Sequence, residues 1–442
     1  MRFLITSNGF LCVFFIFLIV GPHCILFSCT DDDNDPAQTP TPTPQGSSWR
    51  FPRRTMMNDA HSPYPGPITS EIEWSYPLNK PDYSFPIIGP DGAVILSGNH
   101  LYVINPDGSL KWSQEDSKYL LPFVAEDGTI YVISYKRNPE KGMEKFVKAF
   151  HPNGSLLWEK GFYDTYGNSV DSIEGLGEGP DRNIIVTYYD YLGIHSVAFS
   201  IVYLNTEGSI ECSFNGWGQP RFPMALTSNH QLILWYYKYP YYAYLCGCFD
   251  YKGGSCGMWS FPSLGYSNLA TNNYLGYPTT DFYGNTFFRT KAYDKILSGV
   301  VAKDQEGNDI WSIQGICLRD ESYPYLNDGD MALGSDGRLY LLGFDCTDAS
   351  APYLYAIHQD GWILWQQPVP VVSGTELLSQ AGPVVDSDEH IYGITRSTVF
   401  AYHADGSLLW SHEDETENFK GLALSMDSTL YVVGDLRLYA FR

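Results

Sequence analysis

Short stretches of the chain alternate between polar and apolar residues or run through β-branched and aromatic ones. Residues 129–133, 338–342 and 429–433 each begin with a polar residue and continue aliphatic, Tyr, aliphatic, aliphatic. Strands favour such residues and put successive side chains on opposite faces. No sustained stretch has the 3.6-residue period of an amphipathic helix. The pattern predicts an all-β protein.

Glycine turns separate these stretches. Asp-Gly occurs at 91–92, 127–128 and 336–337, and degenerate versions occur near Asn183, Asn229, Gly284, Asp388 and Asp427. Asp-Gly suits two-residue hairpins because glycine adopts a positive φ at no steric cost. A second glycine turn follows each of these. Every repeat of roughly forty to fifty residues is therefore predicted to hold two hairpins and four short strands.

A tryptophan marks the end of most repeats at a fixed distance. Ala or Val stands five residues before a glycine, and Trp stands four residues after it. The units are Val103–Gly108–Trp112, Ala149–Gly154–Trp158, Ala302–Gly307–Trp311, Ala356–Gly361–Trp365 and Ala401–Gly406–Trp410. Two units deviate, because Cys212 follows Gly208 at this distance and Trp259 lies one residue further from Gly254. The spacing predicts one propeller blade per repeat.

The last repeat is incomplete, since it ends at Arg442 before its final strand. The strand that is missing there stands alone near the N-terminus, at residues 71–74. We predict an eight-bladed β-propeller of four-stranded antiparallel blades, closed by pairing of this N-terminal strand with residues 438–441, which leaves no exposed sheet edge there. Structural blade-docking roles are expected for the repeat indoles, Trp74, Trp112, Trp158, Trp259, Trp311, Trp365 and Trp410, through stacking on the next blade.

The N-terminus predicts export and lipidation. Arg2 precedes an apolar run at residues 10–20, which suits a signal peptide better than a membrane-spanning helix. Residues 26–29 resemble the lipobox of bacterial lipoproteins, with Cys29 as the lipidated residue; the alternative is an ordinary signal peptide with an incidental Cys29. Thr30 after it favours the outer membrane, although the following acidic run also resembles a surface-export tag. The expected domains are a signal peptide (1–28), an acidic and Thr/Pro-rich linker (29–62) and the propeller (63–442).

The charge of the chain narrows the classes of partner it can bind. The chain has 50 acidic against 27 Lys and Arg residues and a net charge of -23, so it repels phosphate backbones and nucleic acid is excluded as a partner. The cysteines of the exported part predict disulfides. Six cysteines besides Cys29 allow 15 disulfide connectivities. Cys248 and Cys256 flank a glycine turn and are a possible disulfide, with free buried thiols as the alternative.

One segment is unusually aromatic. Residues 235–244 contain one tryptophan and six tyrosines. Tyrosine supplies contact area at low entropic cost, so we expect a possible contact surface for protein or glycan here. The alternative is cross-strand aromatic pairing within a blade. The residues concerned are Trp235, Tyr236, Tyr237, Tyr239, Tyr241 and Tyr242.

The repeat resembles the tryptophan-docking repeat of pyrroloquinoline-quinone-type propellers over residues 63–442. That resemblance implies the fold and leaves the function open, because the fold serves both quinone-dependent dehydrogenases and non-catalytic proteins. The combination of lipobox, spacer and docked blades is similar to the propeller lipoprotein of the outer-membrane β-barrel assembly machinery. This likeness implies a scaffold that binds other envelope proteins.

Known catalytic patterns are missing from the sequence. It has no Cys-Cys dipeptide, no Cys-x-x-Cys-His, no Gly-rich phosphate loop and no histidines at metal-ligand spacing. We therefore expect no enzyme activity, no cofactor and no metal. The predicted function is a monomeric, membrane-anchored scaffold that binds an envelope protein. The alternatives are a carbohydrate-binding or adhesive surface lipoprotein and, less favoured, a quinone-dependent dehydrogenase.

Overall fold

The computed structural model describes residues 49–442 except for short segments, together with residues 6–7 and 10–11. The segments left out are 79–84, 116, 165, 180, 194–195, 218, 229–230, 239–242, 253–254, 261–271, 293–297, 306, 318–329, 348–350 and 371–380. The chain divides into two units, Met1–Gln45 and Gly46–Arg442. In the first, β1 (Thr6–Ser7) pairs antiparallel with β2 (Phe10–Leu11). Within the described residues, no helix has the length and apolar character needed to cross a membrane.

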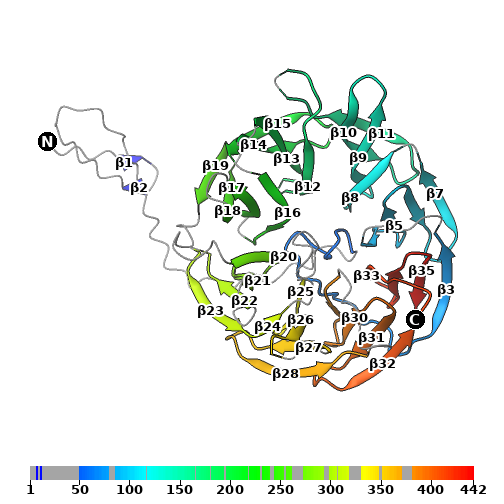
Figure 1. Ribbon diagram of the computed structural model, residues 1–442. Coiled ribbons are helices and arrows are strands. Elements are labelled where there is room, and N and C mark those ends of the chain that lie inside the picture. Colours follow the sequence, from blue (N-terminus) through cyan, green and yellow to red (C-terminus); the bar gives the residue numbers. More distant parts are fainter. Residues whose placement is uncertain are drawn as a thin grey trace. The chain divides into compact units, whose positions relative to one another are not determined.

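Residues 49–442 form a closed ring of antiparallel sheets that radiate from a central axis (Figure 1). In ring order, the innermost strands are β4 (Ile87–Ile88), β8 (Lys118–Val124), β12 (Ser172–Glu178), β16 (Gln219–Leu226), β20 (Asn272–Thr280), β25 (Met331–Leu333), β29 (Val384–Val385) and β33 (Gly421–Leu424). The second strands are β5 (Val94–Ser97), β9 (Ile130–Asn138), β13 (Ile184–Gly193), β17 (Gln231–Lys238), β21 (Thr286–Ala292), β26 (Leu339–Asp345), β30 (Ile391–Ile394) and β34 (Leu430–Val433).

The remaining strands lie toward the rim of the ring. The third strands are β6 (Leu101–Ile104), β10 (Gly142–Phe150), β14 (Ser196–Leu204), β18 (Ala243–Lys252), β22 (Gly299–Lys303), β27 (Pro352–Ile357), β31 (Thr398–Tyr402) and β35 (Arg437–Phe441). The outermost are β7 (Leu110–Gln114), β11 (Leu156–Gly161), β15 (Ile210–Trp217), β19 (Ser255–Ser260), β23 (Asp309–Gln314), β28 (Ile363–Pro368), β32 (Leu408–Glu413) and β3 (Ile72–Pro77). The side chains of the inner strands are buried on both faces of each sheet. Along the outermost strands, side chains alternate between exposed and partly buried.

The predicted count of eight four-stranded blades is wrong. Seven sheets in the described part of the ring have four strands, whereas the sheet that contains β26 has five. The extra strand is β24 (Ile316–Cys317), which pairs with β26 at Phe344 and Asp345. β25 pairs with the same edge of β26, at residues 339–341. Two short strands thus occupy one innermost position, a departure that the glycine and tryptophan spacing does not encode because it marks turns and outer strands, not how many strands share the innermost position.

The N-terminal strand closes the ring. β3 pairs antiparallel with β35, with Trp74 opposite Ala440 and Tyr76 opposite Leu438. The last residue adds a hydrogen bond, since Arg442 N donates to Glu71 O at 3.0 Å. This pairing confirms the predicted partnership of residues 71–74 with residues 438–441. One blade is therefore built from both ends of the described chain.

Tryptophans link five of the described blades to the next one. The indole Nε1 atoms of Trp74, Trp112, Trp158, Trp311 and Trp365 donate at 2.7–3.0 Å to the carbonyls of Pro106, Pro152, Thr206, Gln359 and Ala404. Each acceptor lies two residues before a glycine with positive φ. A Cβ atom on any of these glycines would lie within 3.0 Å of the indole. Glycine is therefore required at these positions by both backbone conformation and the close approach of the ring.

A disulfide fastens the additional strand to its sheet. Cys317 in β24 is bonded to Cys346, which follows β26, and their Cα atoms are 5.0 Å apart. Cys346 N also donates to Gly315 O at 3.1 Å. The bond closes a loop with a sequence separation of 29 residues, for which chain-entropy arguments give a stabilisation of about 3–4 kcal/mol. Cys212, which stands at a repeat tryptophan position, also takes part in a disulfide.

Candidate functional site

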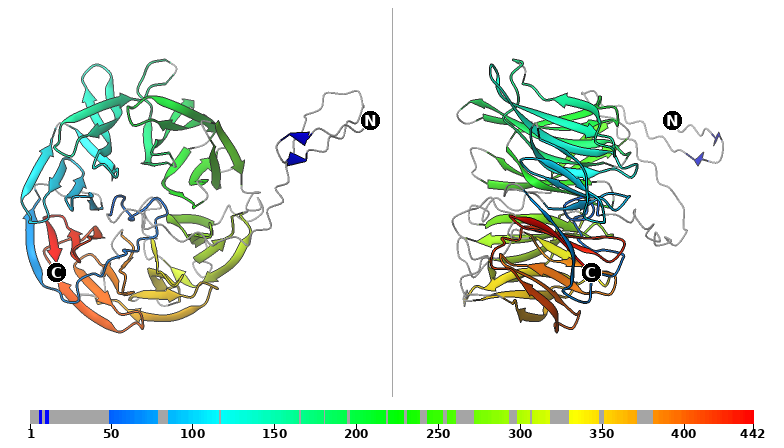
Figure 2. Two further views of the ribbon diagram at one scale, coloured as in Figure 1. Left: turned by 180° about the vertical axis from the view of Figure 1, so that it is seen from behind. Right: turned by 90° about the vertical axis from the view of Figure 1, so that its right-hand side faces the viewer.

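The axis of the ring is occupied by the chain itself. Residues 49–66, here called the channel segment, run through the centre of the ring (blue in Figure 1), and the view from behind in Figure 2 shows the same position. Trp49, Arg53 and Ala60 are almost completely buried. Sequence patterns assign residues 49–62 to the linker, whereas the structure places them inside the ring. The channel that a propeller encloses is therefore filled here.

The backbone of the channel segment bonds to one innermost strand after another. Inner-strand N–H groups donate to its carbonyls at 2.7–3.1 Å. In ring order, the donor and acceptor pairs are Ile88–Trp49, Val124–Arg50, Leu226–Met56, Thr280–Met57, Leu333–Asp59 and Val385–Ala60. These donors come from β4, β8, β16, β20, β25 and β29. The contacts satisfy strand edges that would otherwise face the axis unpaired.

Two side chains of the channel segment add contacts of higher specificity. Arg50 Nε donates to Val124 O at 2.7 Å, and its guanidinium forms an ion pair with Glu178 from β12. Burial raises the pKa of the Glu178 carboxyl, and the charge of Arg50 opposes that rise. Asn58 Nδ2 donates to the carbonyls of Met224 and Pro278 at 2.9 and 3.0 Å. Arg50 thus connects the segment to β8 and β12, and Asn58 connects it to the next two inner strands, β16 and β20.

Arg53 is the most completely buried cation of the segment, with 2% of its surface exposed. Its guanidinium donates to the carbonyls of Met331, Gly382 and Pro383 at 2.5, 3.2 and 3.0 Å. The carboxylate of Asp330 lies 4.0 Å from Nε and is fully buried. A planar guanidinium satisfies several acceptors at once, which a lysine ammonium could not do with the same geometry.

A cluster of carboxylates and histidine fixes the end of the segment. Asp386, Asp388 and His390 offer atoms within 4.8 Å of one another, the spacing of metal ligands. The Oδ1 atom of Asp386 accepts the backbone N–H groups of Asp388 and His390 at 2.9 and 2.8 Å. Its Oδ2 atom accepts Gly66 N at 2.7 Å and Tyr392 Oη at 2.9 Å. Both oxygens therefore accept hydrogen bonds that stabilise the turn at residues 386–390 and hold Gly66 of the channel segment.

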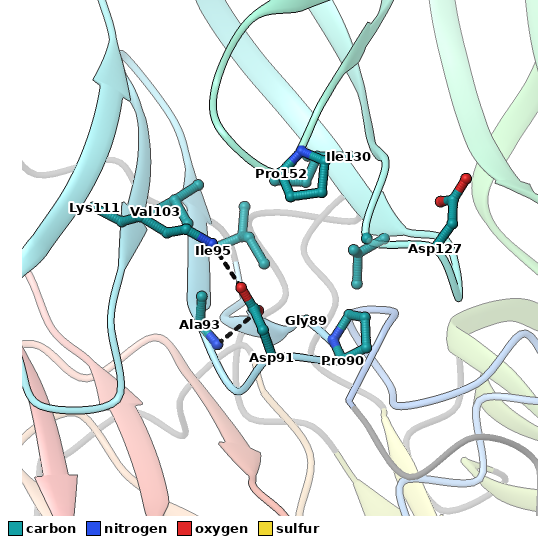
Figure 3. A pocket seen from close by; sticks show the side chains of 12 residues that line it. Gly89, Pro90, Asp91, Ala93, Ile95, Val103, Lys111, Asp127, Ile130 and Pro152 are labelled. Carbon is teal, nitrogen blue, oxygen red and sulfur yellow. Dashed lines mark hydrogen bonds and ion pairs between the residues drawn. The ribbon is translucent and has the colours of Figure 1, made fainter.

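A small pocket lies between two neighbouring blades (Figure 3). It has a volume of about 270 Å³ and an apolar floor that includes Ile95, Val103 and Ile130. At its rim, Lys111 Nζ donates to Asp91 Oδ2 at 2.6 Å. Burial favours a higher pKa for Asp91, but the hydrogen bonds from Lys111 and the Ala93 backbone, together with the charge of Lys111, outweigh it and the pKa is lowered. The volume falls below that of typical cofactor sites, and its charged groups already pair with each other.

An exposed aromatic surface lies where two blades meet. Its residues come from the 162–171 loop between β11 and β12 and from the end of β13: Tyr163, Tyr166, Tyr191, Asp164, Asp171 and Asp190. We call this the tyrosine surface. Tyr166 is 86% exposed, and the other two tyrosines are about half exposed. Tyr191 N donates to Asp171 Oδ2 at 2.6 Å, which joins the loop to β13. The surface is both aromatic and acidic.

The tyrosine surface contains a pair of interacting carboxyl groups. Burial raises the pKa of Asp190 to about 6, and a hydrogen bond with Asp171 and the charges of Asp171 and Asp164 act in the same direction. Lys145 lies close by, and burial lowers its pKa while Asp171 and Asp190 oppose that shift. The proton on Asp190 is favoured because ionised Asp190 would lie beside the negative charges of Asp171 and Asp164.

We expect this proton to make stability depend on pH. Between about pH 4 and pH 6 the folded state retains a proton on Asp190 that the unfolded state has lost, so the free energy of unfolding falls as pH rises through this window. Asp190→Asn keeps a hydrogen-bond donor toward Asp171 at every pH and should remove this part of the slope. Melting temperatures of both proteins from pH 4.5 to pH 7.5 measure the effect. Identical slopes would contradict this protonation of Asp190.

The sequence-predicted contact residues fall largely outside the described part. Tyr239, Tyr241 and Tyr242 lie outside it, and so do the side chains of Trp235, Tyr236 and Tyr237 in β17. The register of β17 and β18 places Trp235 opposite Cys246 and Tyr237 opposite Tyr244. The contact surface predicted at residues 235–242 therefore stays a prediction. The side chain of Trp259 and the lipidation residue Cys29 are likewise outside the described residues.

The predicted Cys248–Cys256 disulfide also stays a prediction, because the side chains of both cysteines lie outside the described residues. The backbone register of β18 and β19 pairs Cys248 with Trp259 and Cys256 with Tyr251. It therefore does not place the two cysteines directly opposite each other.

Sequence reasoning missed the channel segment and the tyrosine surface. A signal for the first exists, since the Thr-Pro spacer and its Gly-Ser-Ser end give way at Trp49 to a stretch with two large aromatic residues and three arginines within six positions. Such a composition is unusual for a solvated linker. The residues of the tyrosine surface are separated along the chain, and the sequence has no spacing that groups them.

Comparisons with known proteins identify the class. The solved structures with which the chain aligns include propellers, and the ring of radial antiparallel sheets has the same architecture, so the chain is a β-propeller. The structure of the Dos1 propeller is similar to it with a TM-score of 0.57 at 11% identity, covering 84% of this chain and 94% of that one. No family model matches the chain, and no curated protein sequence matches it either.

Other solved structures align with the chain less closely. A streptogramin B lyase gives a TM-score of 0.39 at 14% identity, with 84% of this chain and 96% of that one covered. Prolyl oligopeptidase B from Galerina marginata gives 0.48 at 10% identity, with 80% and 55% covered. Similarity at these identities concerns the fold alone, because propellers host unrelated functions.

Proposed function

We propose that this chain is a non-catalytic, lipid-anchored propeller that binds a partner protein at the bacterial cell envelope. The observation that carries the proposal is the tyrosine surface. Tyrosine is enriched at protein interfaces because its ring contributes a large contact area and its hydroxyl a hydrogen bond, at the entropic cost of two rotatable bonds. All three tyrosines are exposed, and the Tyr191 N–H bonds to Asp171 of the loop that carries Tyr163 and Tyr166.

The charge of this surface specifies the partner's chemistry. Asp164, Asp171 and Asp190 lie among the tyrosines, and Glu144 and Glu159 act electrostatically on Tyr163. A protein with a basic patch complements such a site, and complementary charge raises the rate of association and rejects acidic competitors. We therefore expect a basic partner surface with arginine or lysine side chains that stack on the tyrosines.

The filled channel supports a binding role over a catalytic one. Ligand sites in ring-shaped folds use the concave space at the axis, where polar groups from several elements converge. Here that space holds residues 49–66, whose carbonyls and guanidinium groups use the donors and acceptors of the inner strands. The outer faces of the blades and their loops are left as the surfaces for recognition.

The anchor and the compartment follow from the N-terminal sequence. Lipidation at Cys29 would attach the protein to the membrane without a spanning helix. Residues 30–48 would then act as a spacer, which in polyproline II geometry of about 3.1 Å per residue reaches about 60 Å. The Cys317–Cys346 bond is of the kind that persists in oxidising compartments, which supports export.

Crosslinking in intact cells tests this function. A membrane-impermeant or periplasm-accessible crosslinker is applied to cells that express the wild type, and crosslinked proteins are identified by mass spectrometry. We expect one dominant partner whose crosslinks map to residues 162–171 and 189–193. Tyr166→Ala with Tyr191→Ala should reduce its recovery at least tenfold, because exposed interface aromatics contribute about 1–2 kcal/mol each.

Two further variants make the experiment decisive. Tyr283→Ala removes a tyrosine that is 72% exposed in the turn between β20 and β21, and it should leave recovery unchanged. Cys29→Ser should release the protein from the membrane fraction. Equal recovery of the partner with the double variant would overturn binding through the tyrosine surface. Full retention of the Cys29→Ser protein in the membrane fraction would overturn lipid anchoring at Cys29.

A further inference from the structure

The channel segment differs in charge from the protein that surrounds it. It carries three arginines against one aspartate, whereas the whole chain has 50 acidic against 27 Lys and Arg residues. Two of its arginines face acidic groups of the ring, since Arg50 pairs with Glu178 and Arg53 lies 4.0 Å from Asp330. The third, Arg54, pairs with Asp59 of the segment itself. The ring thus presents negative charge and carbonyl oxygens to a basic stretch of chain that folds through turns.

The contacts made by this segment have the form of a peptide-binding site. Six inner strands each give one backbone N–H to a carbonyl of the segment, a pattern that depends on the path of the backbone and not on its side chains. Two arginine positions and one asparagine position then select the sequence, through carbonyl acceptors and carboxylates that converge on each side chain. Backbone contacts therefore give affinity and the side-chain positions give specificity.

We propose that the propeller channel is a binding site for an arginine-bearing peptide that folds through turns, and that residues 49–66 occupy it as a ligand in cis. This goes beyond the proposed function, because the site is on the axis and does not involve the tyrosine surface. All the contacts that hold the segment are non-covalent. The site can accordingly take a separate peptide of the same kind once the resident segment is weakened.

The tether determines what a competing peptide must overcome. A segment joined to its own site acts at an effective concentration in the millimolar range, so a free peptide at micromolar concentration does not displace it. Weakening the resident contacts without altering the ring changes this balance. Arg50→Ala removes the guanidinium from Glu178 and Val124 O, and Asn58→Ala removes two hydrogen bonds to inner strands.

The test uses the full chain and two synthetic peptides in a fluorescence anisotropy titration. One peptide has the sequence of residues 49–66, and its control carries R50A and R53A. We expect the wild-type protein to bind neither peptide at 100 µM or below, a limit that follows from the tether. The Arg50→Ala/Asn58→Ala protein should bind the first peptide with 1:1 stoichiometry and the control at least tenfold more weakly.

Thermal unfolding with and without peptide covers the case in which the double variant is poorly folded. A ligand of the native state raises the melting temperature, so the first peptide should stabilise the double variant, or the milder Arg50→Ala protein, and leave the wild type unchanged. A variant that gains neither binding nor thermal stability from the peptide would overturn the proposal. Equal effects of the two peptides would overturn it as well.

Discussion

Arg53→Ala is expected to lower the free energy of unfolding by about 3–5 kcal/mol, the range for breaking a buried charged network. The substitution leaves the carbonyls of Met331, Gly382 and Pro383 without the guanidinium donor, and it removes the positive charge that lies 4.0 Å from the buried Asp330 carboxylate. These groups belong to the region where β25 and β29 approach the axis. Urea denaturation followed by tryptophan fluorescence measures the change.

A matched variant separates this effect from the loss of any arginine. Arg182 pairs with Glu126 at 2.7 Å, but it is 71% exposed, so solvent competes with the pair. Arg182→Ala should change the free energy of unfolding by less than about 1 kcal/mol. If Arg53→Ala costs no more than Arg182→Ala, the contacts of the channel segment do not contribute to the stability of the ring.

Trp410→Ala is expected to destabilise the protein by a similar amount, about 3–5 kcal/mol. Trp410 is 8% exposed, and its ring stacks on Phe441 with centroids 5.8 Å apart. Its Nε1 donates to Pro67 O at 2.9 Å, just beyond the channel segment. The indole therefore joins β32, the C-terminal strand β35 and the N-terminal chain in one contact. Its loss leaves a large cavity at the closure of the ring.

Trp362 provides the control for this substitution. It lies three residues from the repeat tryptophan Trp365 but is 51% exposed, and its ring stacks on His358 with centroids 4.0 Å apart. Trp362→Ala should cost less than about 1 kcal/mol, because surface substitutions of this kind have small effects. Chemical denaturation of the two variants under identical conditions measures both changes in the free energy of unfolding. Comparable losses would show that stacking between blades is not what distinguishes the repeat indoles.

The parts of the fold that could be predicted are those encoded locally and repeated. A glycine with positive φ and a tryptophan four residues later report the end of a hairpin and the outermost strand of a blade, and this local signal recurs along the chain. The pairing of β3 with β35 could also be predicted from a local pattern, because the sequence leaves one strand without a partner near each end. Neither inference required knowledge of distant contacts.

The innermost positions could not be predicted in the same way. The Asp-Gly turns mark where an innermost strand ends but not how many strands share that position, so the sharing of one position by β24 and β25 had no local signature. The partnership of Cys317 with Cys346 was one of many connectivities that the sequence allowed. The channel segment has neither strand nor helix periodicity, and its partners lie up to 330 residues away along the chain, as for Arg53 and Pro383. Its position depends on the finished ring.

Mechanical load on the tether would meet the channel segment before it reached the ring closure. A pull at Trp49 would be resisted first by the hydrogen bonds that Ile88 and Val124 donate to the segment and by the buried Arg53. Residues 49–66 precede β3 in the chain, so these contacts would have to break before tension reached the β3–β35 pair.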